Sequence, residues 1–471
     1  MRHRPGVVLI VTATVATAVV AWATRGPVTR PSVAVRLEYD GSADQARIAD
    51  GLAIEITRLL AQIDGLEVRA AVRASRYGEQ REDTHTFGVE RGAGLVLEGL
   101  VLVNDRVVRQ IHASLVSTPH RTARWSRWFT PAGSDVFASE RAIVAAVAES
   151  LGLRLPAGQR QYSLDPALQP AFLRARALQA EGGNISRPEA ADLFDWITKV
   201  ASTFTPAFAA LATTLGGHLS IAGPPPPDSR MAATAQTAYE ADSQLAEANV
   251  AMALLSARRC EWTRAGEYFA TALRLDPSAA SAHTDYVIST LLPVGRITDA
   301  LEVLRNALAV DPTSVDVRRT LAYVQLQNND YAEALDTTRW VITHYPDLEL
   351  ADQSHGRALY LSRRIDDSLA WFGKSESQWG HRGYVLSLMG RPDEARTFAE
   401  AHPGESARQL LIYTGLNDLE RAIDALRRTA LDNPWRALVW MEWPEIEPVL
   451  RGDPRAAAIQ AQLRECAIPT R

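Results

Sequence analysis

Hydrophobic residues follow three different spacings along the chain. An uncharged run of 18 residues comes first, from Gly6 to Ala23. In residues 31–156, several short segments alternate apolar and polar positions, as half-buried strands do. Beyond residue 157, apolar residues recur every three to four positions, as on the buried face of a helix. We therefore predict a mainly α-helical protein with an N-terminal hydrophobic segment (1–30), a small α/β domain (31–156) and a long helical domain (157–471).

The alternating region predicts a compact arrangement of strands and helices. A helical stripe of apolar positions ends at Asp64-Gly65, and Asn104-Asp105 lies between two alternating runs as a hairpin turn would. The predicted strands span 33–37, 66–72, 95–103, 107–116 and 125–129, and the predicted helices span 44–63, 84–91 and 136–151.

The N-terminal run predicts export of everything that follows it. As a helix, its 18 residues would be about 27 Å long, barely enough for the bilayer core. Arg2 and Arg4 precede it, which favours a cytoplasmic N-terminus with the bulk of the chain periplasmic. Ala21-Trp22-Ala23 also has the form of a signal-peptidase site, so cleavage and secretion to the periplasm is the alternative. We favour an uncleaved single-pass anchor in the inner membrane, because the run is longer than the apolar region of most signal peptides.

The helical region carries an internal repeat. Asp276-Pro277, Asp311-Pro312 and Tyr345-Pro346 recur at intervals of 35 and 34 residues. This period and its small-residue positions resemble the tetratricopeptide repeat, and they imply three consecutive helix pairs. The repeats are expected at 246–279, 281–314 and 315–348, and 435–450 followed by Asp453-Pro454-Arg455 resembles the cap of such arrays. Stacked repeats of this kind form a superhelix with a concave groove.

The α/β region also carries a resemblance. Ala49-Asp50-Gly51-Leu52, Gly92-Ala93, Val96-Leu97-Glu98-Gly99 and Leu151-Gly152-Leu153 are similar to the small extracytoplasmic domain related to the TolB amino-terminal domain and to FlgO. In CadC-like regulators and repeat-containing adenylyl cyclases, such a domain follows one membrane span and precedes tetratricopeptide repeats. Their cytoplasmic effector lies before the span. Only five residues precede the run here, so neither direct DNA binding nor cyclase activity is expected.

Composition, net charge and cysteine content exclude further classes of function. Hydrophobic residues make up 46% of the chain and charged residues 22%, a normal globular balance. The net charge of -5 argues against nucleic-acid binding, which needs a basic surface. Cys260 and Cys466 form neither a disulfide framework nor a metal-ligand pattern. We interpret them as two isolated thiols with packing roles; a long-range disulfide is the other possibility, since the chain is expected outside the cytoplasm.

The sequence contains no recognisable catalytic motif. A phosphate-binding loop, His-Glu-x-x-His, Gly-x-Ser-x-Gly and Cys-x-x-Cys are all missing. The histidines are scattered; His112 and His120 fall near one predicted strand, but no carboxylate stands at ligand spacing from these two. We therefore expect no enzyme activity, no catalytic residue, no cofactor and no metal site.

The repeats predict where a partner would bind. In arrays of this kind the groove is lined by the first helix of each repeat. Its inward positions here include Asp285, Arg319, Tyr323, Gln353, Arg357 and Tyr360. Arg and Tyr are residue types that anchor protein interfaces.

Our hypothesis is that Arg319, Tyr323, Arg357 and Tyr360 grip an extended peptide; the alternative is a solvated face without a ligand. The expected function is a non-enzymatic, membrane-tethered scaffold for protein–protein interaction in the bacterial envelope. The alternative function is the ligand-sensing half of a split signalling or transcription-regulating system, with a small ligand in the α/β domain.

Overall fold

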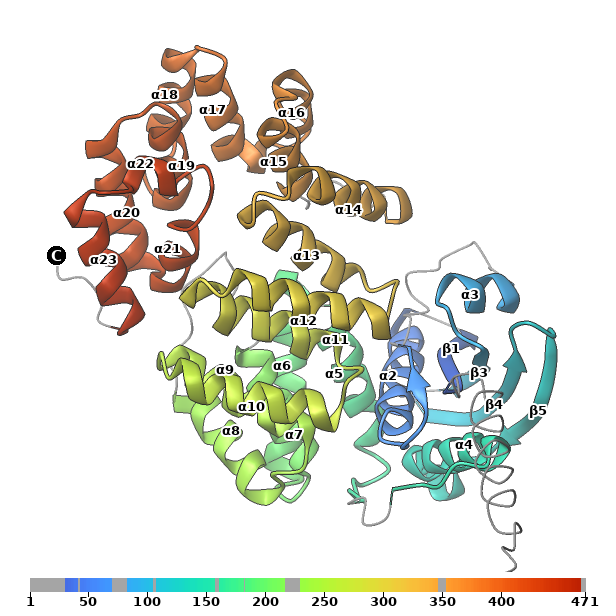
Figure 1. Ribbon diagram of the computed structural model, residues 1–471. Helices are drawn as coiled ribbons and strands as arrows, with labels where there is room; N and C mark the ends of the chain where they lie inside the picture. The colour runs from blue at the N-terminus through green and yellow to red at the C-terminus, as the bar shows by residue number, and fades with distance from the viewer. Residues whose placement is uncertain are drawn as a thin grey trace, which may run out of the picture.

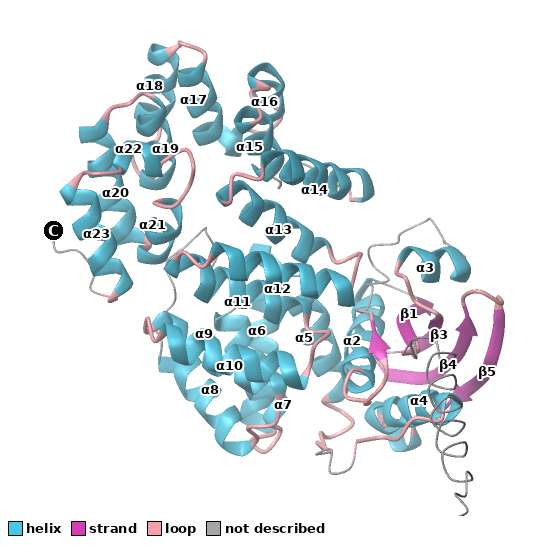
Figure 2. Ribbon diagram, in the orientation of Figure 1, coloured by secondary structure: helices cyan, strands magenta, loops and turns pink. Residues whose placement is uncertain are grey.

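The structure is a computed structural model, and it describes residues 30–40, 43–69, 83–104, 107–156, 161–181, 183–216, 229–345 and 353–466. A small sheet lies at one end of a curved array of helices (Figures 1 and 2). The fold is mainly helical, as predicted. The hydrophobic run from Gly6 to Ala23 lies outside the described residues. Within them, no helix combines the length and the hydropathy needed to cross a membrane.

The sheet has five strands in the order β2-β1-β3-β4-β5. β1 is parallel to both β2 and β3, whereas β3, β4 and β5 pair antiparallel. The strands are β1 Ser32–Asp40, β2 Glu67–Val68, β3 Leu95–Asn104, β4 Val107–Ser117 and β5 Thr122–Phe129, and the helices of this region are α2 Ala43–Leu60, α3 Thr84–Glu90 and α4 Val136–Leu151. The predicted order of elements is confirmed; the second strand has only two described residues.

Helix α4 has the bounds that the sequence predicts, because both of its ends carry local signals. The Asp135 side chain accepts a hydrogen bond from the backbone N–H of Ala138, 3.1 Å away, and so caps the N-terminus. Gly152 has a φ of 65° at the other end, a left-handed conformation that glycine adopts without strain. The backbone N–H groups of Gly152 and Leu153 then bond to the last free carbonyls of the helix.

The rest of the chain is a stack of antiparallel helices. It contains α5 Gln169–Glu181, α6 Gly183–Val200, α7 Thr205–Gly216, α8 Ser229–Ala241, α9 Ala246–Arg258, α10 Trp262–Leu275, α11 Ala280–Tyr286, η3 Val287–Leu291, η4 Leu292–Val294, α12 Ile297–Val310, α13 Val315–Gln327, α14 Tyr331–His344, α15 Gln353–Leu361, α16 Ile365–Phe372, α17 Trp379–Leu388, α18 Pro392–Ala401, α19 Ser406–Gly415, α20 Leu419–Asp432, α21 Pro434–Trp440, α22 Glu447–Leu450 and α23 Pro454–Arg464. The three predicted repeats coincide with α9/α10, α11/α12 and α13/α14.

The recurring Asp-Pro pair lies in the turn that connects one repeat to the next. Asp276 accepts hydrogen bonds from the backbone N–H and the hydroxyl of Ser278, and Asp311 accepts the same two bonds from Thr313. Asx turns of this kind end one helix pair and begin the connection to the next. The middle repeat is less regular, since Pro293 has no backbone N–H and follows a π-helical turn.

The sheet and the first helices share one hydrophobic core. The residues that pack between α2, α4 and the sheet continue without interruption into α5, α6 and α7. Gly51 on α2 lies against the backbone of Leu173 on α5, where a Cβ would collide with the Leu173 carbonyl. Arg69, after β2, donates a 2.7 Å hydrogen bond to the Val310 carbonyl at the end of α12. The α/β region is therefore a packed part of the array.

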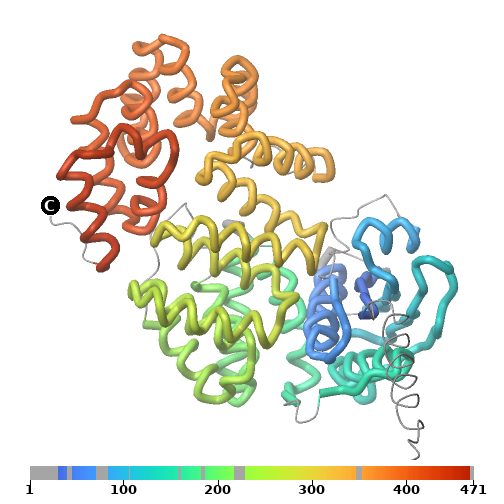
Figure 3. Tube along the Cα trace, viewed as in Figure 1, coloured from blue at the N-terminus to red at the C-terminus, as the bar shows by residue number. Residues whose placement is uncertain are grey.

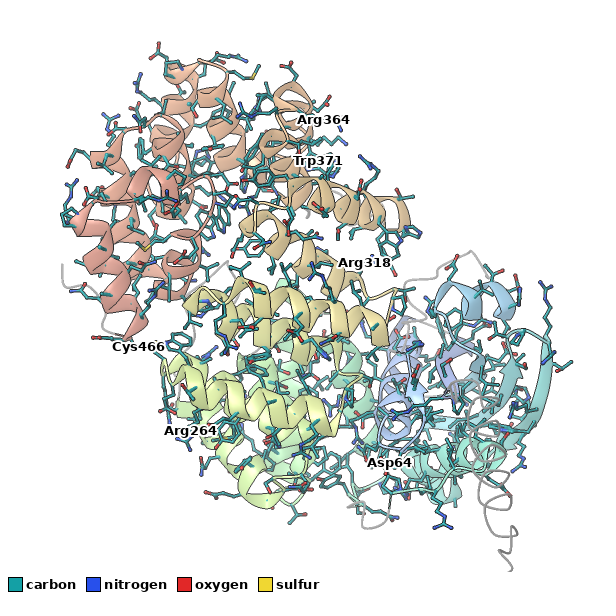
Figure 4. All side chains as sticks on the ribbon, in the orientation of Figure 1. Asp64, Arg264, Arg318, Arg364, Trp371 and Cys466 are labelled. Carbon is teal, nitrogen blue, oxygen red and sulfur yellow. A yellow bond between two sulfur atoms is a disulfide. The ribbon has the colours of Figure 1, made fainter. Side chains whose placement is uncertain are left out.

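The C-terminal end of the helical array contacts its middle. Cys466, after α23, forms a disulfide with Cys260, in the turn after α9, with their Cα atoms 5.8 Å apart and a sequence separation of 206. The indole of Trp262 donates a 3.1 Å hydrogen bond to the Arg464 carbonyl beside it. Figures 3 and 4 show the C-terminal helices curving back to lie beside α9. The prediction of two isolated thiols is therefore wrong, because folding brings two distant turns together.

Candidate binding cavity

A large cavity opens on the concave side of the array, between the α/β region and the first repeats. It has a volume of about 1330 Å³ and is called the inner cavity below. Its walls come from α2, α4, α5, α6, α7, α9, α10, α11 and α13 and the turns between them, and therefore from both parts of the chain. In Figure 1, α2 and α5 lie side by side between the sheet and the first repeats. Cavities at the junction of two structural units are common binding sites.

Two of the six predicted groove residues line the inner cavity. Asp285 is a buried residue of α11, and Arg319 is a half-buried residue of α13. Within the described residues, the Arg319 guanidinium makes no hydrogen bond or salt bridge, so it can serve a ligand. The structure thus places both residues on the inner face that the repeat pattern indicated.

The other four predicted residues lie further along the concave face, where the chain itself covers them. Arg357 and Glu445 form a salt bridge with Nε–Oε1 and Nη2–Oε2 distances of 2.8 and 2.9 Å, and neither side chain is exposed to solvent. The Tyr360 hydroxyl donates a hydrogen bond to the same carboxylate. Tyr323 accepts a 2.7 Å hydrogen bond from the indole of Trp443.

Gln353 lies at the edge of the same region and bonds to another helix of the array. Its side-chain oxygen is 3.0 Å from Nε2 of His381 on α17. These four residues, Tyr323, Gln353, Arg357 and Tyr360, therefore contact the C-terminal part of the chain in this structure. Of the six predicted groove residues, Asp285 and Arg319 remain as candidates for binding a peptide.

The segment that fills this region is the connection between α21 and α22. Trp443 is completely buried and stacks on Trp440 with ring centroids 4.2 Å apart. The Arg357 guanidinium carbon lies 3.7 Å from the ring centroid of Trp443. A stacked guanidinium with a bidentate carboxylate is a strong arrangement for a buried charge. The residues predicted as a cap thus turn inward and close one half of the concave face.

An ion network crosses one wall of the inner cavity. Arg176 on α5 contacts Glu55 on α2 at 2.9 Å and Glu247 on α9 at 2.6 Å. Arg58 contacts the same Glu55 at 2.9 Å. Both Arg176 and Glu55 are buried, so the network joins the α/β region to the repeats through charges removed from water.

Burial and neighbouring charges shift the pKa values of the two carboxyl groups nearest this network in opposite directions. Burial by itself would raise the pKa of Glu55, but Arg58 and Arg176 outweigh it and hold that pKa below its ordinary value. The pKa of Glu140 is raised to about 8, first by burial and then by the negative charge of Glu55. At neutral pH, therefore, Glu55 is ionised and Glu140 is protonated.

Sequence reasoning missed this network, although a signal was present. Glu55 stands three residues after Leu52 and four before Leu59, so it interrupts the apolar stripe of its helix. Glu140 is likewise surrounded by buried positions of α4. A charged residue on an otherwise buried helical face needs a partner from another element. The partner itself could not be read from sequence, since Arg176 lies 121 positions after Glu55.

No arrangement in the described part of the chain suggests a metal centre. No group of three or more His, Cys, Asp or Glu side chains comes close enough together there to hold an ion. The polar groups of the inner cavity are arginines, carboxyls, hydroxyls and amides. Such groups bind ligands through hydrogen bonds and ion pairs.

Comparisons with known proteins agree with the helical repeats. A family model described as tetratricopeptide repeat matches residues 291–348, a segment that overlaps the second and third predicted repeats. The putative adenylate cyclase 3 of Rhizobium meliloti (strain 1021) is 25% identical over 191 residues, which cover 39% of this chain and 32% of that protein. The chain thus matches about a third of that relative's length.

Two solved structures align with part of the chain. One, from the functional characterisation of Pseudomonas aeruginosa pilF, is 18% identical and covers 42% of this chain and 90% of its own, with a TM-score of 0.33. The other is TTC0263, a thermophilic TPR protein of Thermus thermophilus. It is 19% identical and covers 41% of this chain and 99% of its own, with a TM-score of 0.35.

Proposed function

We propose that this protein is a non-enzymatic scaffold that binds a partner protein through the inner cavity. Tetratricopeptide arrays present concave surfaces that generally serve protein–protein interaction. The observation that carries the proposal is that one part of the concave face is covered by the chain and another part is open. Trp443 and Glu445 cover Tyr323, Arg357 and Tyr360. The inner cavity is open and contains Arg319, whose guanidinium has no partner among the described residues.

We further propose that the protein is tethered to the inner membrane by residues 6–23 and that its bulk lies in the periplasm, with a TolB/FlgO-like α/β domain. The disulfide between Cys260 and Cys466 supports this location, because disulfides persist in oxidising compartments. Thiol alkylation in intact cells before lysis tests it. Reactive thiols at both positions would contradict an oxidising location.

Crosslinking and affinity capture from membranes test the scaffold role. The full-length tagged protein is compared with Arg319→Glu, which reverses a charge in the inner cavity, and with Arg305→Glu, which makes the same change at an exposed position of α12. A partner lost with Arg319→Glu and retained with Arg305→Glu supports binding in the inner cavity. A partner retained by both variants excludes this site. Because the core is shared, point variants are better than removal of either part of the chain.

The second candidate function is ligand sensing for a separately encoded effector. The ion network favours it, since Glu55, Arg176 and Glu247 connect the α/β region to the repeats across the wall of one cavity. The partial similarity to a putative adenylate cyclase is in line with a signalling role. Stability of the full chain in the presence of small molecules tests this candidate. A small molecule that raises the melting temperature through the inner cavity, with no protein captured there, would favour sensing over scaffolding.

A further inference from the structure

Glu140 is a buried acid that forms no salt bridge in the described part of the chain. Its side chain lines the inner cavity and is only 4% exposed. Within the described residues, its carboxyl makes no hydrogen bond and no salt bridge. An acid removed from water in this way is costly unless a partner reaches it or it keeps its proton.

The cations around Glu140 are already engaged with other acids. From α2, Arg58 pairs with Glu55, and from α5, Arg176 pairs with Glu55 and with an acid of α9. On α4 itself, Arg141 faces Asp135 at 3.8 Å. These groups, together with the negative Glu55, are the charges that act on Glu140, and the result is the raised pKa described above.

The lining as a whole has more acids than bases. Six arginines line the inner cavity: Arg58, Arg141, Arg176, Arg187, Arg274 and Arg319. Nine acids line it: Glu55, Glu140, Glu181, Asp242, Glu247, Asp276, Asp285, Asp311 and Asp316. A cavity with this surplus favours a cationic ligand over an anionic one.

We propose that the inner cavity receives an arginine or lysine side chain of a bound peptide segment, and that Glu140 accepts this cation. The inference rests on the proposed scaffold function and specifies the chemistry of the partner. A peptide fits better than a free amine, because the volume of about 1330 Å³ exceeds the roughly 300–1,000 Å³ of most small-molecule sites. The walls also extend from α4 to α13, so a longer ligand can contact both ends.

Binding changes the protonation state of Glu140. The O–H bond of the carboxylic acid breaks, the proton passes to the solvent, and the carboxylate formed pairs with the incoming cation. Close to one proton is therefore released per bound peptide at pH 7, and the affinity rises as the pH increases toward 8. A side chain that only fills space would release no proton.

Calorimetric titration of the full chain tests the inference with defined probes. The probes are alanine pentapeptides, acetylated and amidated at their ends, with Arg, Lys, Gln or Glu at the centre, and putrescine serves as a free amine. The Arg and Lys peptides should bind at least ten times more tightly than the Gln peptide at pH 8. Titrations at pH 7 in buffers of different ionisation enthalpy should show proton release with the basic peptides alone.

Two variants test whether Glu140 causes the preference for basic peptides and the proton release. Glu140→Gln resembles the protonated acid in shape and should lose both the preference for basic peptides and the proton release. Glu149→Gln, at an exposed position of the same helix, should keep both. Circular dichroism checks that each variant is folded.

Several outcomes would overturn the inference. They are equal binding of the Arg and Gln peptides, retention of the preference by Glu140→Gln, and binding of putrescine as tightly as the Arg peptide. If the Arg319→Glu capture experiment succeeds while the peptides show no preference, this inference fails and the scaffold function stands. If the preference is found while no protein is captured through the cavity, the scaffold function fails alone.

Discussion

The salt bridge between Arg357 and Glu445 gives the most direct test of how the concave face is closed. In Glu445→Gln, the amide oxygen can still accept a hydrogen bond, but its NH₂ group faces the donors of the guanidinium. The charge of Arg357 then remains in a site that is 0% exposed, without its counter-ion. Breaking one side of a buried pair in this way typically costs about 3–5 kcal/mol. We expect the free energy of unfolding to fall by that amount.

Glu447→Gln is the matched control, because it makes the same chemical change two residues later. Glu447 pairs with Arg451, whose side chain is 73% exposed, and a pair of this kind contributes at most about 1 kcal/mol. Urea unfolding followed by circular dichroism, with the disulfide intact, measures both variants. Equal, small losses for the two variants would refute the buried-pair reasoning. The double variant Arg357→Met with Glu445→Leu should recover much of the loss, since it removes both charges together.

Three further predictions follow from the same structure. Replacing Cys260 and Cys466 by Ser should lower the free energy of unfolding by about 5 kcal/mol, given the sequence separation of 206 residues, and should make urea unfolding insensitive to reductant; an unchanged midpoint would argue against the bond. The folded state keeps a proton on Glu140 up to a pH of about 8, whereas the unfolded state loses it near 4.5, so stability should fall by about 1.4 kcal/mol per pH unit across this window. Glu140→Gln should flatten that part of the pH profile, and an identical slope would contradict the assignment. Gly51→Ala should cost about 1–3 kcal/mol in thermal unfolding, because a Cβ has no room there, while Gly404→Ala, with open space around it, should change little.

Only a small part of the candidate site could be located from sequence, and the sequence did not show which inward positions the chain itself covers. The repeat period indicates which helices face inward, and the structure places Asp285 and Arg319 on the wall of the inner cavity. The same reasoning selected Arg357 and Tyr360, which also face inward. Nothing local to them indicates that Glu445, 85 positions after Tyr360, folds back to cover both.

The sequence by itself determined the elements and their order. Alternation, apolar stripes and helix caps are interactions among residues a few positions apart, and they predicted α4 to the residue and the three central repeats. Only the tertiary structure decided the disulfide, the shared core around Gly51 and the inward turn at Trp443. Each of these depends on contacts between residues about 120 to 206 positions apart. Such contacts are set by the curvature that accumulates over many helix pairs, and no short stretch of sequence specifies that curvature.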